Sequence, residues 1–198
     1  MSNGLSSLGV RRVLYSLLLT IGLVPVGGCD GIVERRWSEE VEIDEGNVIV
    51  VDRYIKFQES NSLAGDAYSS TTIKSTLAFT GELSKLPSWD VPLVPLVLYR
   101  DQTGGELVIV ATSYSCEVWR ERGKPAPPYW EYRLKANKWS QSPLSQISIG
   151  RESNMFFNYE PPLKSHKLSR EWKRNIVRQS EFAKEYRVID ASVRSNCM

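Results

Sequence analysis

The sequence is poor in the residues that build metal and redox centres, with one histidine and three cysteines among 198 residues. Three cysteines are too few for a disulfide-dense miniprotein, and a single histidine leaves few ligands for a transition metal. A strong charge of either sign is also missing, because 25 Lys+Arg stand against 23 Asp+Glu, whereas nucleic-acid-binding proteins normally have a strong basic excess. The 41% hydrophobic and 24% charged residues are typical of a folded globular protein without a nucleic-acid partner.

Local catalytic signatures are absent. The sequence contains no Gly-x-Ser-x-Gly elbow, no Ser-x-x-Lys, no His-Glu-x-x-His and no glycine-rich phosphate loop. Carboxylates cluster from Glu39 to Glu45, but they lack the spacing of an EF-hand and fit an acidic turn better than a Ca²⁺ site. We therefore expect no metal and no cofactor. The carboxylate pair of a glycosidase has no local signature, so a hydrolase stays open as an alternative.

Residues 1–28 have the composition of a secretory signal peptide. Arg11 and Arg12 precede an uncharged, leucine-rich run from Val13 to Cys29, and no acidic residue occurs in this segment. The run ends in small residues and falls short of the roughly 20 apolar residues that a membrane-spanning helix needs. An exported protein follows from this pattern.

The end of the segment, Val26-Gly27-Gly28-Cys29, resembles the bacterial lipobox, an aliphatic residue and two small residues before an obligatory cysteine. The resemblance implies cleavage before Cys29 and acylation of that residue, with palmitate among the chains, which together make a stable membrane anchor. Asp30 resembles the signal that retains enterobacterial lipoproteins in the inner membrane, so the periplasmic face of the inner membrane is favoured over the outer membrane. The alternatives are an uncleaved helix or an ordinary signal peptide.

The chain that remains after cleavage before Cys29 has a length that is typical of a single domain. We expect residues 29–40 to comprise the lipidated cysteine and a charged tether. Residues 41–198 are expected to form a single β-rich domain that ends in a helix.

Acylation of Cys29 leaves Cys116 and Cys197, and two cysteines in an oxidising compartment favour a disulfide between them. The alternative is a catalytic Cys116 thiolate with His166, the only histidine, as its base, as in cell-wall cysteine peptidases. In those enzymes the cysteine opens a helix, whereas the residues from Tyr114 to Trp119 predict a strand. We therefore favour the disulfide.

Alternation of apolar and polar residues predicts several strands joined by short turns. A first hairpin joins residues 41–43 and 48–57 through the acidic turn 44–47, with Ile49, Val51, Ile55 and Phe57 on one face, and residues 58–71 form a long loop. A strand with Ile73, Leu77 and Phe79 on one face follows. The apolar runs 93–99 and 107–111 form a hairpin at the centre of a sheet, although Pro92 and Pro95 favour an edge or a bulge. The last hairpin joins residues 129–134 to Trp139 through residues 135–138. The prediction is a mainly β fold, an antiparallel sandwich or meander with α+β as the alternative, and one C-terminal helix.

The C-terminal helix is the only one that the sequence predicts. Ser169 suits its N-cap, and Trp172, Ile176 and Val177 form an apolar stripe, with Lys173 and the neighbouring arginines largely on other faces. This region is basic, whereas residues 30–66 are strongly acidic. One hypothesis is that the basic helix contacts anionic lipid headgroups. We favour the alternative, in which its basic side chains lie on a solvated face and pair with the acidic segment.

Six aromatic residues lie between Tyr114 and Trp139, and basic residues lie close to them. Alternation places Trp130, Tyr132 and Leu134 on one face, where we expect the core. The candidates for contact with a partner are Trp119, Arg120, Arg122, Lys124 and Tyr129. They flank the Pro-rich loop 123–128, which is stiff and therefore loses little entropy on docking.

Residues 115–119, 123–129 and 139–144 resemble a pattern in uncharacterised proteobacterial periplasmic lipoproteins. The resemblance covers a small part of the chain and implies a Gram-negative periplasmic lipoprotein without an assigned activity. The hypothesis is a membrane-anchored, non-enzymatic protein that binds a protein or another cell-envelope component. The alternatives are an immunity-like inhibitor of an envelope-attacking hydrolase and a periplasmic hydrolase of wall glycan or lipid.

Overall fold

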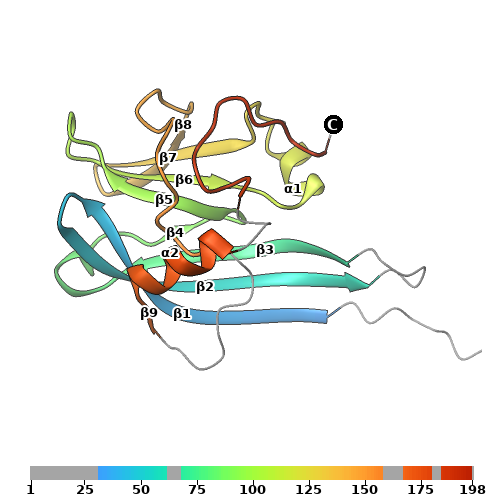
Figure 1. Cartoon of the computed structure of the whole chain (residues 1–198), viewed down its shortest axis with the longest axis horizontal. Helices are drawn as coiled ribbons and strands as arrows, with labels where there is room; N and C mark the ends of the chain where they lie inside the picture. Colours follow the sequence, from blue (N-terminus) through green and yellow to red (C-terminus); the bar gives the residue numbers. More distant parts are fainter. Residues whose placement is uncertain (1–30, 62–67, 158–166, 180–183, 198) are drawn as a thin grey trace, which may run out of the picture.

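The computed structural model describes residues 31–61, 68–157, 167–179 and 184–197, which form a mainly β fold (Figure 1). One sheet has the strand order β4-β3-β2-β1-β9 and the other β5-β6-β7-β8. All neighbouring strands are antiparallel except β1 and β9. The predicted fold class is confirmed. In chain order the elements are β1 (Gly31–Asp44), β2 (Asn47–Asn61), β3 (Tyr68–Phe79), the 3₁₀ helix η1 (Gly81–Leu83), β4 (Trp89–Asp90), β5 (Val94–Arg100), β6 (Leu107–Thr112), α1 (Cys116–Glu121), β7 (Tyr129–Lys135), β8 (Lys138–Ser142), β9 (Lys167–Leu168) and α2 (Arg170–Gln179).

The first sheet is built on a long hairpin of β1 and β2. The strands pair from Gly31 opposite Glu59 to Asp44 opposite Asn47. Gly46 takes a φ of 75° in the turn, a conformation that glycine adopts without steric cost. The predicted first hairpin is confirmed, and it is longer at both strands than the sequence pattern indicated.

Residues 31–40, expected in a charged tether, instead form the first part of β1. The folded domain therefore includes residues 31–40. Every second side chain of this segment points inward. Two of these inward positions are occupied by the charged residues Arg35 and Glu39, so the sequence does not show the alternation of apolar and polar residues that is typical of a strand. The predicted loop at residues 58–71 is also corrected, because residues 58–61 extend β2 and residues 68–71 extend β3.

The main core lies between the facing sides of the two sheets. Val51 and Leu77 of the first sheet belong to the same buried cluster as Ile109 and Trp130 of the second. All four side chains are at most 2% exposed. The face predicted for Trp130 is therefore confirmed as core.

A bulge in β3 corrects the predicted position of Ile73, which is exposed rather than buried. Lys74 pairs with Lys56 but Thr72 pairs with Phe57, so one residue of β3 is extra at this point. The inward side chain is consequently Thr72, which is buried.

Strands β5 and β6 of the second sheet are buried on both faces. Its outer face carries Leu96, Val108 and Val110, which cluster with Phe157 and Ile189 of the C-terminal region. The C-terminal region therefore forms a third layer over the β-sandwich. Burial on both faces explains why β5 and β6 read as continuous apolar runs.

β5 lies at the edge of the second sheet, and its register with β6 shifts between Pro95 and Val97. The edge and the bulge predicted from the prolines are confirmed, and of the two strands predicted at the sheet centre only β6 is interior. The amides of Asn154 and Met155 donate to the carbonyl of Leu96 at 3.2 and 3.1 Å. The C-terminal segment thus covers part of this edge.

The predicted C-terminal helix is confirmed as α2. Ser169 Oγ accepts a hydrogen bond from the amide of Trp172 at 3.2 Å, as expected for an N-cap. Trp172 and Ile176 pack against a cluster that includes Trp37 and Phe57 on the inner face of the first sheet. None of the described helices has the length and apolar character required to cross a bilayer.

Candidate partner-binding surface

A six-residue helix, α1, stands where the sequence predicted a strand. Ser115 caps it, because its side chain accepts a hydrogen bond from the amide of Val118 at 3.4 Å. Val118 and Trp119 are buried on its inner side. β-branched and aromatic residues favour strands, so the prediction followed propensity and missed the serine cap.

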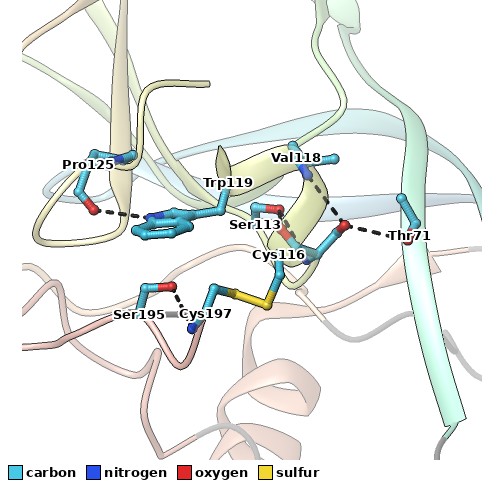
Figure 2. Close-up of a disulfide and its surroundings, with 9 residues drawn as sticks. Thr71, Ser113, Cys116, Val118, Trp119, Pro125, Ser195 and Cys197 are labelled. Atoms are coloured by element: carbon cyan, nitrogen blue, oxygen red, sulfur yellow. Dashed lines mark hydrogen bonds between the residues drawn. A yellow bond between two sulfur atoms is a disulfide. The ribbon is translucent and has the colours of Figure 1, made fainter. Parts of the chain in front are cut away.

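The disulfide between Cys116 and Cys197 confirms the predicted pairing (Figure 2). It joins the first residue of α1 to the C-terminal segment across a sequence separation of 81 residues. The amide of Cys197 also donates to Ser195 Oγ at 3.1 Å. In this bonded form Cys116 has no thiolate for nucleophilic catalysis, and His166 lies outside the described residues.

The Pro-rich loop 123–128 is held by buried side chains on both of its arms. The indole N–H of Trp119 donates to the carbonyl of Pro125 at 3.2 Å (Figure 2). Trp130 donates in the same way to Arg122 at 3.2 Å, and Thr112 Oγ1 donates to the carbonyl of Pro128 at 2.9 Å. These three bonds, together with three prolines, leave the loop backbone little freedom.

Two surface hollows border this loop, and Pro125 and Ala126 line both of them. The first has a volume of about 410 Å³ and is bounded by α1 and the C-terminal segment with Cys197. The second has a volume of about 490 Å³ and extends to residues 141–144 at the end of β8. The loop therefore stands between two concave regions of the surface.

The five predicted contact residues divide into two groups. Arg120 and Lys124 are exposed beside the first hollow. Arg122 is half-buried and donates to the hydroxyl of Tyr132 at 3.3 Å. Trp119 and Tyr129 are only 6% and 3% exposed, so their predicted role as direct contacts is corrected.

Both side chains act instead as supports, Trp119 beneath the loop and Tyr129 beneath the C-terminal layer. Trp119 holds the carbonyl of Pro125, and Tyr129 belongs to the cluster under the C-terminal layer. Burial raises the pKa of Tyr129, so its hydroxyl stays neutral under physiological conditions. The exposed part of the surface is consequently smaller and more basic than the aromatic-rich sequence suggested.

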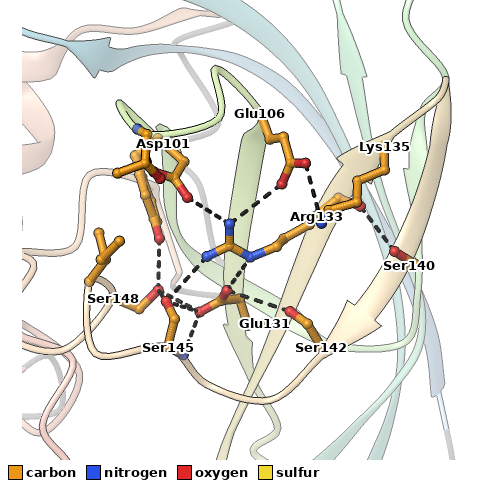
Figure 3. A network of polar contacts seen from close by, with 12 residues as sticks. Asp101, Glu106, Glu131, Arg133, Lys135, Ser140, Ser142, Ser145 and Ser148 are labelled. Atoms are coloured by element: carbon orange, nitrogen blue, oxygen red, sulfur yellow. Dashed lines mark hydrogen bonds and ion pairs between the residues drawn. The ribbon is translucent and has the colours of Figure 1, made fainter.

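A buried polar network on the outer face of the second sheet was not predicted (Figure 3). Glu131 of β7 is fully buried and accepts hydrogen bonds from the hydroxyls of Ser145 and Ser148 at 2.8 and 2.7 Å. Arg133 Nε donates to the other Glu131 oxygen at 2.7 Å. The network attaches residues 145–148 to the sheet. Alternation had placed Glu131 on the face opposite Trp130, and the apolar runs of β5 and β6 were the signal that this face is also covered.

Two carboxyl groups of this network, those of Asp101 and Glu131, have lowered pKa values. Burial alone would raise the pKa of Glu131, but hydrogen bonds from Ser145, Ser148 and Arg133 lower it below its ordinary value. The pKa of Asp101 is lowered more strongly, by hydrogen bonds from Thr103 and then from Arg133. These groups therefore suit structural acceptors rather than proton donors near neutral pH.

The acidic residues of β1 are paired with the basic C-terminal region, the arrangement that we favoured over lipid headgroups. Lys167 lies 2.9 Å from Glu40, and Arg170 forms a close ion pair with Glu42. Lys173 is buried, which corrects its predicted place on a solvated face. No group of three or more metal-ligating side chains occurs within the part of the chain that the structure describes.

The membrane-anchor residues Cys29 and Asp30 lie outside the described residues. Comparisons with protein-family models, with curated proteins and with solved structures find no match to this chain.

Proposed function

We propose that this protein is a lipid-anchored, non-enzymatic protein of the periplasmic face of the membrane that binds a protein or another envelope component through the loop 123–128 and its two hollows. The observation that carries the binding role is the fixed loop itself. A loop whose backbone is already ordered loses little conformational entropy when a partner docks. Trp119 and Trp130 supply that order without being exposed.

The chemistry of the partner follows from the side chains around the first hollow. Arg120 and Lys124 offer two exposed cations, and Pro125 and Ala126 offer apolar surface beside them. A partner segment with a carboxylate beside an apolar side chain would complement both features. The disulfide supports an oxidising compartment, in agreement with the lipobox-like sequence before Cys29.

A hydrolase receives less support from the described residues. A glycosidase needs one carboxyl group with a raised pKa to act as the general acid. The four described carboxyl groups whose pKa clearly departs from its ordinary value, Glu40, Asp101, Glu131 and Asp190, all have it lowered.

Site-specific photo-crosslinking tests the binding proposal. A photoreactive phenylalanine analogue at Ala126, in the full chain in its own membranes, should capture one partner. The matched control places the same analogue at Lys138, which is also exposed and is the first residue of β8. We expect an adduct from position 126 alone, and its yield should fall when Lys124→Glu is added. Identical adducts from both positions, or none from either, would reject the loop as the binding surface. An adduct that contains an envelope hydrolase would assign the inhibitor role.

Mass spectrometry of the mature protein tests the anchor separately. We expect lipid on Cys29 and an unprocessed, unacylated precursor for Cys29→Ser. A wild-type Cys29 without lipid would end the lipoprotein proposal and leave the loop proposal standing.

A further inference from the structure

A polar cavity lies between α2 and the C-terminal segment 152–155, away from the loop 123–128. Its volume is about 470 Å³. Four cations line it, namely Arg170, Lys173, Arg174 and Arg187, against two carboxylates, Glu42 and Glu152. These residues come from β1, α2 and the C-terminal layer, so the cavity is a product of the tertiary fold.

The ion pairs of the cavity leave positive charge in excess. Glu42 is shared by Arg170 and Arg174, the second of which lies 3.7 Å away. One carboxylate thus offsets one of two guanidinium groups. Within this group of three described residues, one positive charge has no negative partner.

The same imbalance recurs directly behind the cavity. Glu39 accepts hydrogen bonds from both Arg53 and Lys173, each at 2.7 Å, and all three residues are at most 4% exposed. A second uncompensated positive charge is therefore held in a buried site, where salt screens it little.

Unused hydrogen-bond donors point to the kind of ligand. The Lys173 ammonium has three N–H groups and donates to Glu39 and to the carbonyl of Asn154 at 2.6 Å. No described residue accepts its third N–H, although Lys173 lines the cavity. Arg170 binds Glu42 with one terminal nitrogen, and no described side chain or backbone group accepts from the rest of its guanidinium.

We propose that this cavity binds a phosphate group, either as a free phosphate or as the phosphodiester of a lipid headgroup. The excess of cations over carboxylates in the lining suits a phosphate better than a carboxylate, and the several oxygens of a phosphate accept from Lys173, Arg170 and Arg174 together. The volume exceeds that of a bare phosphate, so an organic substituent also fits. This site is independent of the proposed partner surface.

Calorimetric titration of the full chain, purified in detergent, tests the proposal with two probes. Inorganic phosphate represents the free ligand, and dihexanoyl-phosphatidylglycerol below its critical micelle concentration represents the headgroup. Arg174→Gln removes an exposed donor whose only described ion pair is the long contact with Glu42, so we expect it to weaken binding about tenfold. Glu152→Gln removes a carboxylate from the lining and should tighten binding about threefold. Arg36→Gln, an exposed arginine of β1 that lines neither this cavity nor the two hollows of the proposed partner surface, is the matched control and should leave binding unchanged.

The outcomes separate the two sources of phosphate. Binding of the phospholipid alone, with the expected responses of the variants, assigns the headgroup, and binding of inorganic phosphate with those responses assigns the free ion. Absence of binding to both probes overturns the proposal. Equal weakening by Arg174→Gln and Arg36→Gln also overturns it, because the binding would then reflect general surface charge.

Discussion

The ammonium of Lys173 on α2 donates a 2.7 Å hydrogen bond to Glu39 on β1, which joins two buried residues that are 134 positions apart in the sequence. Arg53 of β2 binds the other oxygen of Glu39 at 2.7 Å. Burial lowers the pKa values of both cations, and their attraction to Glu39 opposes this effect. A single carboxylate therefore holds β1, β2 and α2 together.

Removal of this carboxylate should be far more damaging than removal of one cation. Glu39→Gln leaves two buried cations without a counter-ion, and we expect it to lower the free energy of unfolding by about 3 to 5 kcal/mol. Lys173→Met keeps the Glu39–Arg53 pair and should cost less than about 2 kcal/mol. Urea denaturation measures both values. The control Lys167→Met removes a half-exposed partner of Glu40 and should change stability by less than about 1 kcal/mol. Equal losses from Glu39→Gln and Lys173→Met would contradict a shared central carboxylate.

The disulfide should stabilise the fold, and its Cys197 also lines the first hollow of the partner surface. We expect Cys197→Ser to lower the free energy of unfolding by about 2 to 5 kcal/mol, because the bridge closes a long loop of the unfolded chain. Non-reducing peptide mapping of protein prepared without reductant should find Cys116 joined to Cys197. Two titratable thiols in that protein would disprove the bridge, and rapid selective alkylation of Cys116 would restore the enzyme hypothesis.

Acid should destabilise the protein through the network around Arg133. The pKa of Asp101 is lower in the folded protein than in the unfolded chain, so its ionisation stabilises the fold above about pH 4. This contribution is lost as the pH falls through the folded pKa. Asp101→Asn should be less stable than the wild type at pH 7, and the difference should shrink towards pH 2. Denaturation curves at several pH values measure this, and a constant difference would argue against a linked carboxylate.

Asp30 makes a prediction about sorting. If the residue after the acylated cysteine acts as in enterobacterial lipoproteins, the full chain should fractionate with the inner membrane. Asp30→Ser should move it towards the outer membrane. Density-gradient fractionation against porin markers measures the distribution, and recovery of the wild type with the porins would reject the inner-membrane assignment alone.

The sequence pattern was sufficient for the strands whose inward residues are apolar. Val51 and Leu77 followed from alternation, and so did the two hairpins that meet at β6 and β7. It failed where a charged residue occupies an inward position. Glu39 and Glu131 are buried because of partners that lie 134 and 14 positions away, and no local period of hydrophobicity encodes such partners.

The candidate partner-binding surface also could be predicted only in part from local sequence patterns. The Pro-rich loop and its basic neighbours were recognisable from residue type, whereas the burial of Trp119 depends on α1 and on the C-terminal segment closing over it. A strand at residues 114–119 would have presented this indole differently. Short helices of six residues depend on a single cap and on tertiary packing, so propensity alone does not predict them.

The position of Gly31 at the start of β1 limits where the proposed lipoprotein could work. One residue separates Cys29 from Gly31, so an acylated Cys29 would reach the sheet across about 7 Å at most. The domain would therefore stay close to the membrane surface and could not extend far into the periplasm. It would search for its partner by lateral diffusion in the plane of the bilayer, and a soluble partner would have to approach the headgroups to be bound.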